Sequence, residues 1–333
     1  MFEAVVKATT GAVALALVSC VLSMPAAAQQ DTKAPEARPG SPTFLTMRGG
    51  GGAGSWYIGS SVIATIVNQD VPNVNFTATP GSANRNLTDV QEGKVQYGLA
   101  VARSAVEAVE GLAPFKSKHD KVRAVMALYP LQLQIVARQN QNIANFRDLY
   151  GKRVSAGQRG FTTLQVFEDL MKLDGKPTGT VKLQYLNYAD GNQQFQDREL
   201  DAVMALSFAP SPTYTELESL FPIQIVQIED DLIEAFTKKY PGYTRGVIPG
   251  SAYKSVTKDT PTIVSQTLFV TSSERSDAEV YAITKAIYEK RAALAAADVA
   301  FANIGTDTIL DGINIPLHPG AERYWREIGA LKK

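Results

Sequence analysis

The residues that could do chemistry in this 333-residue sequence gather in one glycine-rich segment. Gly49, Gly51 and Gly54 match the spacing G-x-G-x-x-G, and Asp70 follows at about the distance of a ribose-binding carboxylate in dinucleotide-binding proteins. A run of four glycines matches many spacings, so the pattern is compatible with a dinucleotide-binding enzyme without requiring one. More generally, the glycines predict a tight turn whose backbone amides, with the start of the next helix, bind an anionic group.

Side chains for metal binding or nucleophilic catalysis are scarce. The chain has one cysteine, Cys20, and two histidines, His119 and His318, so we predict no metal site. Neither histidine lies in a nucleophile motif, and the position of His318 before a proline favours a structural role. We therefore predict no catalytic residue and no enzyme activity. The alternative is an enzyme that pairs one histidine with nearby hydroxyl groups.

Charge and composition exclude further classes of protein. The 33 basic and 33 acidic residues give zero formal net charge, which disfavours binding to nucleic acid or to an anionic membrane. A chain that is 45% hydrophobic and 20% charged can bury a core, so a mainly disordered chain is excluded. The length suggests about two domains.

The N-terminus has the form of an export signal. An apolar run at 11–24 precedes Ala26-Ala27-Ala28, so we predict a signal peptide at 1–28, cleavage after Ala28 and a periplasmic protein. The apolar run is too short to span a membrane. Alternatively, Leu17–Cys20 is a lipoprotein signal acylated at Cys20, which would suit a lipid-anchored surface antigen. Residues 29–42 have three prolines and no apolar spacing, and we expect a disordered leader there.

Strands and helices alternate after this leader, which predicts an α/β fold with a mostly parallel sheet. A strand at 44–47, the glycine cluster and a helix at 55–68 form one strand-loop-helix unit, and 152–171 repeats that order. Residues 125–137 and 262–272 are long extended segments that could cross between two lobes. The other expected elements are strands at 74–79, 95–101 and 153–156 and helices at 82–92, 146–150 and 276–294, the last with a capping box from Ser276 to Glu279.

Several short motifs, in order along the chain, carry a family resemblance. They are Arg48–Tyr57; Thr79–Ser82 with Asn84 and Asn86; Val122–Ala124 with Leu128–Pro130; Gly151–Val154; Ile248–Pro249 with Tyr253; and INIPLHPGAERYWREIG at 313–329. Together they resemble the TAXI-type solute receptors of tripartite ATP-independent periplasmic (TRAP) transporters, over nearly all of the chain after residue 28. The segment Pro316–Ala321 is the most distinctive.

The resemblance implies a two-lobe periplasmic-binding-protein-like fold of type II, with hinge strands joining the lobes and a ligand cleft between them. It assigns 43–131 and 265–333 to lobe 1 and 132–264 to lobe 2. It implies a periplasmic receptor, expected to be a monomer, that closes on a small organic acid, a carboxylate, and delivers it to the TRAP permease subunits. Neither a cofactor nor a nucleic acid partner is implied.

Family ligands are typically small carboxylates held by loops at helix starts, so the resemblance nominates three loops and one turn as the ligand site. The ligand-binding residues carried over are Gly54, Ser55, Trp56 and Tyr57; Thr79, Gly81, Ser82 and Asn84; Phe161, Thr162 and Thr163 of the loop 158–163; and Pro210 of the turn 209–212. Each has a structural alternative. Ser55 could be only a helix cap, Trp56 and Tyr57 core aromatics, and Ser82 and Asn84 turn residues.

Two departures from the family pattern bear on the ligand. Many relatives carry Gln-Ser-Asp where this chain has Val101-Ala102-Arg103, and Gly-Ser-Gly where it has Gly160-Phe161-Thr162 after Arg159. An arginine binds a carboxylate through two N–H groups, and Phe161 can stack on a flat ligand. We therefore expect Arg103 and Arg159 to bind an acid without an amino group, such as a dicarboxylate or an aromatic acid. A glutamate-like amino acid is the alternative ligand, and both arginines could instead be solvated surface charges.

Overall fold

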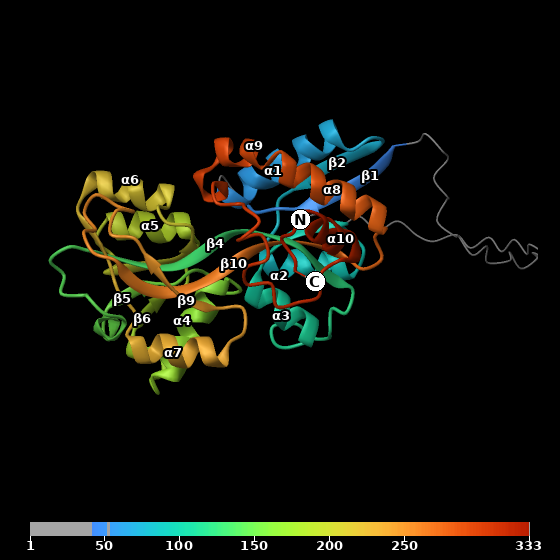
Figure 1. The fold of residues 1–333 in the computed structure, drawn as a ribbon. Coiled ribbons are helices and arrows are strands. Elements are labelled where there is room, and N and C mark those ends of the chain that lie inside the picture. The colour runs from blue at the N-terminus through green and yellow to red at the C-terminus, as the bar shows by residue number, and fades with distance from the viewer. Residues whose placement is uncertain (1–41, 52–53, 333) are drawn as a thin grey trace, which may run out of the picture. The chain divides into compact units, whose positions relative to one another are not determined.

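Strands and helices alternate around one mixed sheet in the computed structural model, which describes residues 42–51 and 54–332 (Figure 1). The predicted signal peptide and all but the last residue of the predicted leader lie outside the described residues, as do Gly52 and Ala53. Within those two ranges, no helix combines the length and the apolar character that a membrane crossing needs. The sheet order is β2-β1-β3-β10-β4-β7-β5-β6, with β8 beside β4 and β9 beside β10.

The first half of the sheet contains the predicted strand-loop-helix unit. Its elements are β1 (Thr43–Arg48), α1 (Ser55–Asp70), β2 (Val74–Thr79), α2 (Ala83–Gln91), β3 (Tyr97–Val101) and α3 (Ala102–Glu110). The strand β1 pairs in parallel with both β2 and β3. Since each strand is followed by a helix, the starts of α1, α2 and α3 lie at the same edge of the sheet.

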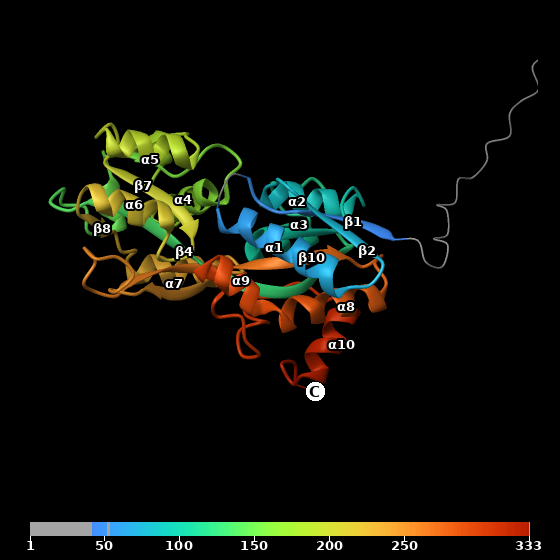
Figure 2. The same cartoon turned by 90° about the horizontal axis from the view of Figure 1, so that it is seen from above.

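Two long antiparallel strands, β4 (Val122–Arg138) and β10 (Thr260–Ser272), join this half to the rest and confirm the two predicted extended segments (Figures 1 and 2). One part of β10 pairs with β3, and the other part pairs with β9 (Thr244–Ile248). The second part of β4 pairs with β7 (Ala202–Ser207). Each of the two strands therefore belongs to both halves of the sheet.

The second half repeats the arrangement of a short parallel sheet with helices. Its further elements are η1 (Phe146–Leu149), β5 (Arg153–Ser155), α4 (Thr162–Leu173), η2 (Thr178–Thr180), β6 (Lys182–Gln184), α5 (Tyr188–Gln196), α6 (Pro212–Leu220), β8 (Ile223–Ile225) and α7 (Asp230–Lys239). The strand β5 pairs in parallel with β6 and β7. The starts of α4, α5 and α6 thus follow the ends of β5, β6 and β7.

The C-terminal elements pack on the first half. They are α8 (Asp277–Glu289), α9 (Arg291–Ala297), η3 (Val299–Phe301) and α10 (Pro319–Glu327). One hydrophobic cluster contains Leu45 of β1 together with Ile287 and Trp325 of these helices, whereas a separate cluster contains Phe167 and Phe236 of the second half. Fully burying a side chain of this size stabilises a fold by about 1.5–3 kcal/mol. Each half therefore has a core of its own.

The predicted helix at 276–294 differs from the structure in two details. It is divided at Lys290 into α8 and α9. Ser276 accepts a hydrogen bond from the backbone N–H of Glu279 at 3.3 Å, but the carboxylate of Glu279 accepts from the Tyr97 hydroxyl (2.8 Å) and from Arg275. The capping box is thus half formed, because the buried hydroxyl of Tyr97 needs that carboxylate as its acceptor.

Candidate ligand-binding site

A cavity of about 1120 Å³ lies between the two halves, and the starts of helices form much of its wall. From the first half it is lined by the glycine loop before α1, the turn before α2 and the end of β3. From the second half it is lined by the starts of α4, α5 and α6 and by the end of β7. The volume slightly exceeds the usual range of about 300–1,000 Å³ for small-molecule sites.

Five helices that begin at this cavity have no side-chain cap. Their N-cap residues Gly54, Ser82, Val101, Phe161 and Ser211 all line the cavity, and none of these described side chains accepts a hydrogen bond from the first turn of its helix. The first N–H groups of a helix have no partner inside the helix, and its dipole places partial positive charge there. The convergence of five such ends makes the cavity favourable for an anionic group.

Basic side chains do not contribute to this preference. Among the described residues that line the cavity there is no arginine, lysine or histidine, and the charged ones are Glu216 and Asp298. The carboxylate of Asp298 accepts a hydrogen bond from the backbone N–H of Ala300 at 2.9 Å, whereas Glu216 is exposed. An anion in this cavity would therefore meet backbone amides, hydroxyls and side-chain amides.

Aromatic side chains form the apolar part of the wall on both sides. The indole N–H of Trp56 donates to Thr267 Oγ1 of β10 at 3.1 Å, which fixes the ring against a crossing strand. Phe161 packs against Tyr188 with ring centres 5.0 Å apart, and the hydroxyls of Tyr188 and Thr163 lie 2.6 Å apart. These rings offer flat apolar surface to a ligand of more than a few carbon atoms.

Asn86 of α2 holds two loops and strand β3 of the first half in register. Its side chain is fully buried; Nδ2 donates to the carbonyl groups of Gly49 (2.9 Å) and Leu99 (2.8 Å), and Oδ1 accepts from the backbone N–H of Ser82 (3.0 Å). A Cβ atom on Gly81 would lie 2.1 Å from Oδ1, so only glycine fits beside it. One amide thus positions the glycine loop and the start of α2.

The start of α6 is held in a similar way from the second half. The backbone N–H of Ser211 donates to the Tyr253 hydroxyl at 2.8 Å, and that hydroxyl in turn donates to Gln134 of β4. Burial raises the pKa of Tyr253, so its hydroxyl stays protonated and can make both bonds. Tyr253 of the predicted motif is therefore a positioning residue for the turn that contains Pro210.

Ten of the fourteen residues nominated from the sequence line the cavity. They are Gly54, Ser55, Trp56, Gly81, Ser82, Asn84, Phe161, Thr162, Thr163 and Pro210. They come from α1, α2 and α4 and from the turn before α6. The folded chain therefore brings together the three nominated loops and the nominated turn.

The other four nominated residues, Tyr57, Thr79, Arg103 and Arg159, do not line this cavity. Tyr57 is 47% exposed on α1, and the Thr79 hydroxyl donates to the carbonyl of Met47 at 3.0 Å, a bond that joins β2 to β1. Arg159 is exposed, with its guanidinium 4.2 Å from the centre of the Tyr185 ring. The side chains of Tyr57 and Arg159 are therefore exposed outside the cavity, and the Thr79 hydroxyl is used in a bond between two strands.

Arg103 corrects the expectation most clearly. Its side chain neither lines the cavity nor reaches solvent, because it is 4% exposed and lies 2.6 Å from Glu107 and 2.5 Å from Asp169. The idea that a guanidinium replaces the family carboxylate at the ligand therefore has no support in the geometry. The alternative of a solvated surface charge is wrong as well.

The sequence reasoning missed several residues of the wall. Asn187 and Tyr188 at the start of α5, and Leu206 and Phe208 at and after the end of β7, line the cavity. The Asn187 side chain accepts from the backbone N–H of Asp190 at 2.9 Å, which is a helix cap. Asn187 followed three residues later by Asp190 could have indicated this helix start, whereas nothing local marks Leu206 or Phe208.

Both histidines have structural partners. His318 is fully buried; its Nδ1 accepts from the backbone N–H of Gly320 (3.1 Å), so Nε2 carries the proton and donates to the carbonyl of Arg275 (3.1 Å). His119 lies 3.2 Å from the Thr88 hydroxyl. Neither lines the cavity. Among the described residues, no group of three potential ligands could hold a metal ion.

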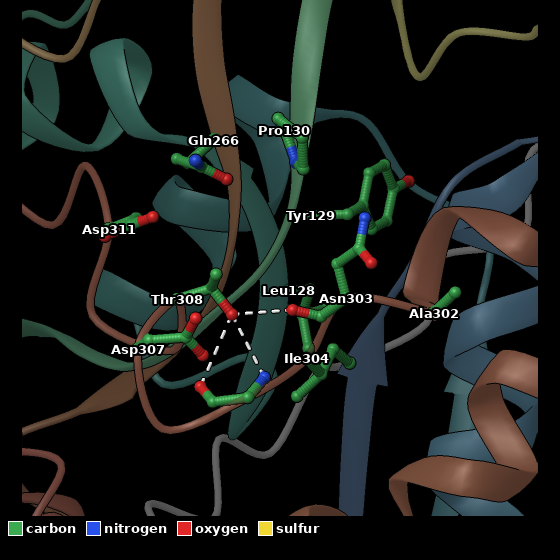
Figure 3. Close-up of a pocket in the computed structure, with 11 residues that line it drawn as sticks. Leu128, Tyr129, Pro130, Gln266, Ala302, Asn303, Ile304, Asp307, Thr308 and Asp311 are labelled. Carbon is green, nitrogen blue, oxygen red and sulfur yellow. Dashed lines mark hydrogen bonds between the residues drawn. The ribbon is translucent and has the colours of Figure 1, made fainter.

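A second hollow of about 610 Å³ lies beside Tyr129, Pro130 and Gln266 of the two crossing strands (Figure 3). Its far wall is the loop that contains Asp307 and Asp311, and the Thr308 hydroxyl donates within that loop to the carbonyl of Asn303. Both residues are exposed to solvent overall. Partial loss of water around the Asp311 carboxyl group, together with the nearby charge of Asp307, raises the pKa of Asp311. This hollow lacks the converging helix starts of the larger cavity.

Comparison with known proteins gives a family and distant likenesses in fold. The chain is similar to the periplasmic aliphatic sulphonate binding protein SsuA from Escherichia coli (14% identity, 77% of this chain and 79% of that chain, TM-score 0.44). It is similar to the probable amino-acid ABC transporter extracellular-binding protein ytmK from Bacillus subtilis (14%, 78% and 98%, TM-score 0.48). SsuA from Xanthomonas axonopodis pv. citri bound to MOPS is a further likeness (16%, 86% and 84%, TM-score 0.45). The model of the NMT1-like family matches residues 47–329, so the chain belongs to the NMT1-like family.

Proposed function

We propose that this protein is an extracytoplasmic solute receptor that binds a small organic acid in the cavity between its two halves. The observation that carries the proposal is the convergence of five uncapped helix starts on one cavity whose described lining residues include no basic side chain. Such a site favours a single anionic group and holds it by directional hydrogen bonds rather than by net charge. Among the described residues that line it, no nucleophile is hydrogen-bonded to a basic side chain, which suits binding rather than turnover.

The ligand we propose is a carboxylate with an apolar or aromatic body. The carboxylate would lie among the helix starts, and the body would pack against Trp56, Phe161 and Tyr188, which line the same cavity. Arg103 and Arg159 both lie outside the wall, so the two arginines that were expected to bind a dicarboxylate do not reach the ligand. An aromatic or branched monocarboxylate is therefore the better candidate.

A glutamate-like or other amino acid is the second candidate, and Glu216 is the observation that favours it. Glu216 lies on α6, lines the cavity and is exposed to it or to solvent, so it could pair with a ligand ammonium group. The two candidates differ in one test. Glu216→Gln should weaken binding of an amino acid and leave binding of an amine-free acid unchanged.

The lobes, the location and the partner remain proposals that rest on the sequence. We assign residues 43–131 and 265–333 to lobe 1 and 132–264 to lobe 2, with β4 and β10 as the hinge strands. The N-terminal signal and the TAXI-type motifs support a periplasmic receptor that delivers its ligand to a TRAP permease. Co-expression with candidate permeases and uptake of the bound acid would test that partner, and uptake through an ATP-dependent importer would overturn it.

A charge introduced at one helix start tests the ligand site. Ser82→Asp places a carboxylate at the N-cap of α2, where it can cap the helix and occupy the place of the ligand anion. We expect binding of the acid, measured by calorimetry, to weaken at least about tenfold, a change of ~1.4 kcal/mol. The melting temperature should stay the same or rise.

Ser276→Asp is the matched control, because Ser276 is the N-cap of α8 and does not line the cavity. Its affinity for the acid should equal that of the wild type. The acid itself is found by native mass spectrometry of the purified protein and by thermal shift with aromatic, branched and amino acids. If Ser82→Asp binds as tightly as Ser276→Asp, the ligand anion does not lie at the start of α2 and the proposed site is wrong.

A further inference from the structure

A cluster of buried and half-buried polar side chains joins the two halves in addition to β4 and β10. It contains Arg103 and Glu107 of α3 from the first half, and Gln165 and Asp169 of α4 from the second. Arg103 Nε donates to Glu107 at 2.6 Å, and Arg103 Nη2 lies 2.5 Å from Asp169. Gln165 Nε2 donates to the same Glu107 oxygen at 2.9 Å. One hydrogen bond and one ion pair thus connect α3 to α4.

The segment after α7 completes the enclosure of Arg103. The guanidinium carbon lies 4.4 Å from the centre of the Tyr240 ring, and the Tyr240 hydroxyl donates to Asp169 at 2.9 Å. Gly242 packs on the backbone of α3, since a Cβ atom there would lie 2.8 Å from the nitrogen of Arg103. One arginine of the first half is therefore inserted among side chains of the second half, where its charge has carboxylate and aromatic partners.

This cluster lies on the same helices whose starts form the cavity wall. Val101, the N-cap of α3, lines the cavity, and so do Thr162 and Thr163 at the start of α4. Arg103 is on the first turn of α3, and Asp169 is about two turns along α4. A contact between these two side chains therefore fixes the spacing of two helix starts on opposite sides of the cavity.

Some polar atoms of this contact lack hydrogen bonds, as expected for a contact that breaks when the two halves separate. Arg103 Nη1, Glu107 Oε2 and Asp169 Oδ2 are buried and have no hydrogen-bond partner among the described residues, although Asp169 Oδ2 lies 2.5 Å from Arg103 Nη2 in the ion pair. A buried ion pair with unmet hydrogen bonds gains little net free energy, because the cost of removing its charges from water offsets their attraction. Separation of the two halves would return these atoms to water. The closed and open arrangements can then lie close in free energy.

We propose that Arg103, Glu107 and Asp169 form a clasp that holds the two halves in the closed arrangement, with Arg103 as a positioning residue rather than a ligand contact. The clasp acts through the spacing of α3 and α4. Its effect on ligand affinity rests on the proposed function, whereas its effect on the separation of the two halves can be measured without any ligand.

Small-angle X-ray scattering of the ligand-free protein tests the clasp directly. Asp169→Asn keeps the shape of the side chain and removes its charge, so we expect a larger radius of gyration than in the wild type. Glu168→Gln is the matched control, because it removes one charge from the neighbouring, exposed position of the same helix. Its radius should equal that of the wild type. Circular dichroism reports whether each variant is folded.

Gln165→Leu is the second variant, in case Asp169→Asn does not fold. It removes the hydrogen bond to Glu107 without placing a charge, and we expect a smaller shift of the radius in the same direction. The clasp is wrong if the folded variants all have the radius of the wild type.

Affinity separates this proposal from the proposed function. If closure accompanies binding, Asp169→Asn should bind the acid about 5- to 150-fold more weakly than Glu168→Gln, the usual range for coupled equilibria. If Asp169→Asn has a larger radius of gyration but neither it nor the wild type binds an acid, the clasp is supported and the proposed ligand is wrong. If the radius and the affinity of Asp169→Asn both equal those of Glu168→Gln, the clasp is wrong and the proposed ligand is unaffected.

Discussion

Asn86→Asp gives the sharpest test of how the cavity wall is held together. The substitution changes one atom, because an oxygen replaces the nitrogen that donates to Gly49 and Leu99. The ionised carboxylate can still accept from the N–H of Ser82, but it places an oxygen 2.9 Å and 2.8 Å from two carbonyl oxygens. Two buried carbonyl groups then lose their donor, at about 1–3 kcal/mol for each.

The side chain is fully buried, so the introduced carboxyl also has a strong pH dependence. Burial and the two carbonyl oxygens both favour the protonated form and raise its pKa in the folded state above the unfolded value of ~3.9. A protonated carboxyl keeps one donor. At a pH below ~3.9, the variant should therefore lose only the free energy of one hydrogen bond, about 1–3 kcal/mol. As the pH rises from ~3.9 to the folded pKa, the free energy of unfolding falls by ~1.4 kcal/mol for each pH unit.

Urea unfolding, followed by circular dichroism at pH 4 and at pH 7.5, measures this difference. We expect Asn86→Asp to lose at least about 2 kcal/mol more at pH 7.5 than at pH 4, relative to the wild type. Asn314→Asp is the control, because Asn314 is exposed and donates only to the carbonyl of Gly312 in its own loop. An equal loss at both pH values would refute the reasoning, since it would mean that position 86 is open to water in the folded protein.

The other predictions concern single positions around the same framework. Gly81→Ala places a methyl group against Asn86 Oδ1, so unfolding free energy should fall by roughly 1–3 kcal/mol, whereas Gly179→Ala, where nothing lies within 4 Å, should change little. Burial lowers the pKa of His318, so the stability that it contributes is fully present above the unfolded pKa of ~6.5 and is lost as the pH falls through the lower folded pKa. Thermal melts at a series of pH values would show this loss. The variant His318→Asn should lack it. Trp56→Phe loses the bond to Thr267 and should cost about 1 kcal/mol in urea unfolding; no loss would mean that the indole is not fixed by β10.

Much of the fold could be predicted from local patterns. The two extended segments became β4 and β10 because their apolar residues can be buried on both faces, and nearly all residues of β4 are buried. The glycine cluster and the following apolar spacing predicted the first loop and α1. The division of the helix at Lys290 and the use of Glu279 by Tyr97 were not predictable, because both depend on contacts with distant segments.

The sequence by itself determined the α/β order and the scarcity of catalytic and metal-binding side chains, since these follow from residue types and short-range spacing. The loops proposed to hold the ligand came from the family resemblance. Only the tertiary structure decided which side chains enter the cavity. Arg103 and Arg159 both follow strands and looked alike as carboxylate ligands, yet one is enclosed between α3 and α4 and the other lies against Tyr185 in an exposed loop. The physical reason is that the partners of a charged side chain come from segments far away in the sequence. Asp169 is 66 residues from Arg103, by the difference of their numbers, and no local pattern announces their contact.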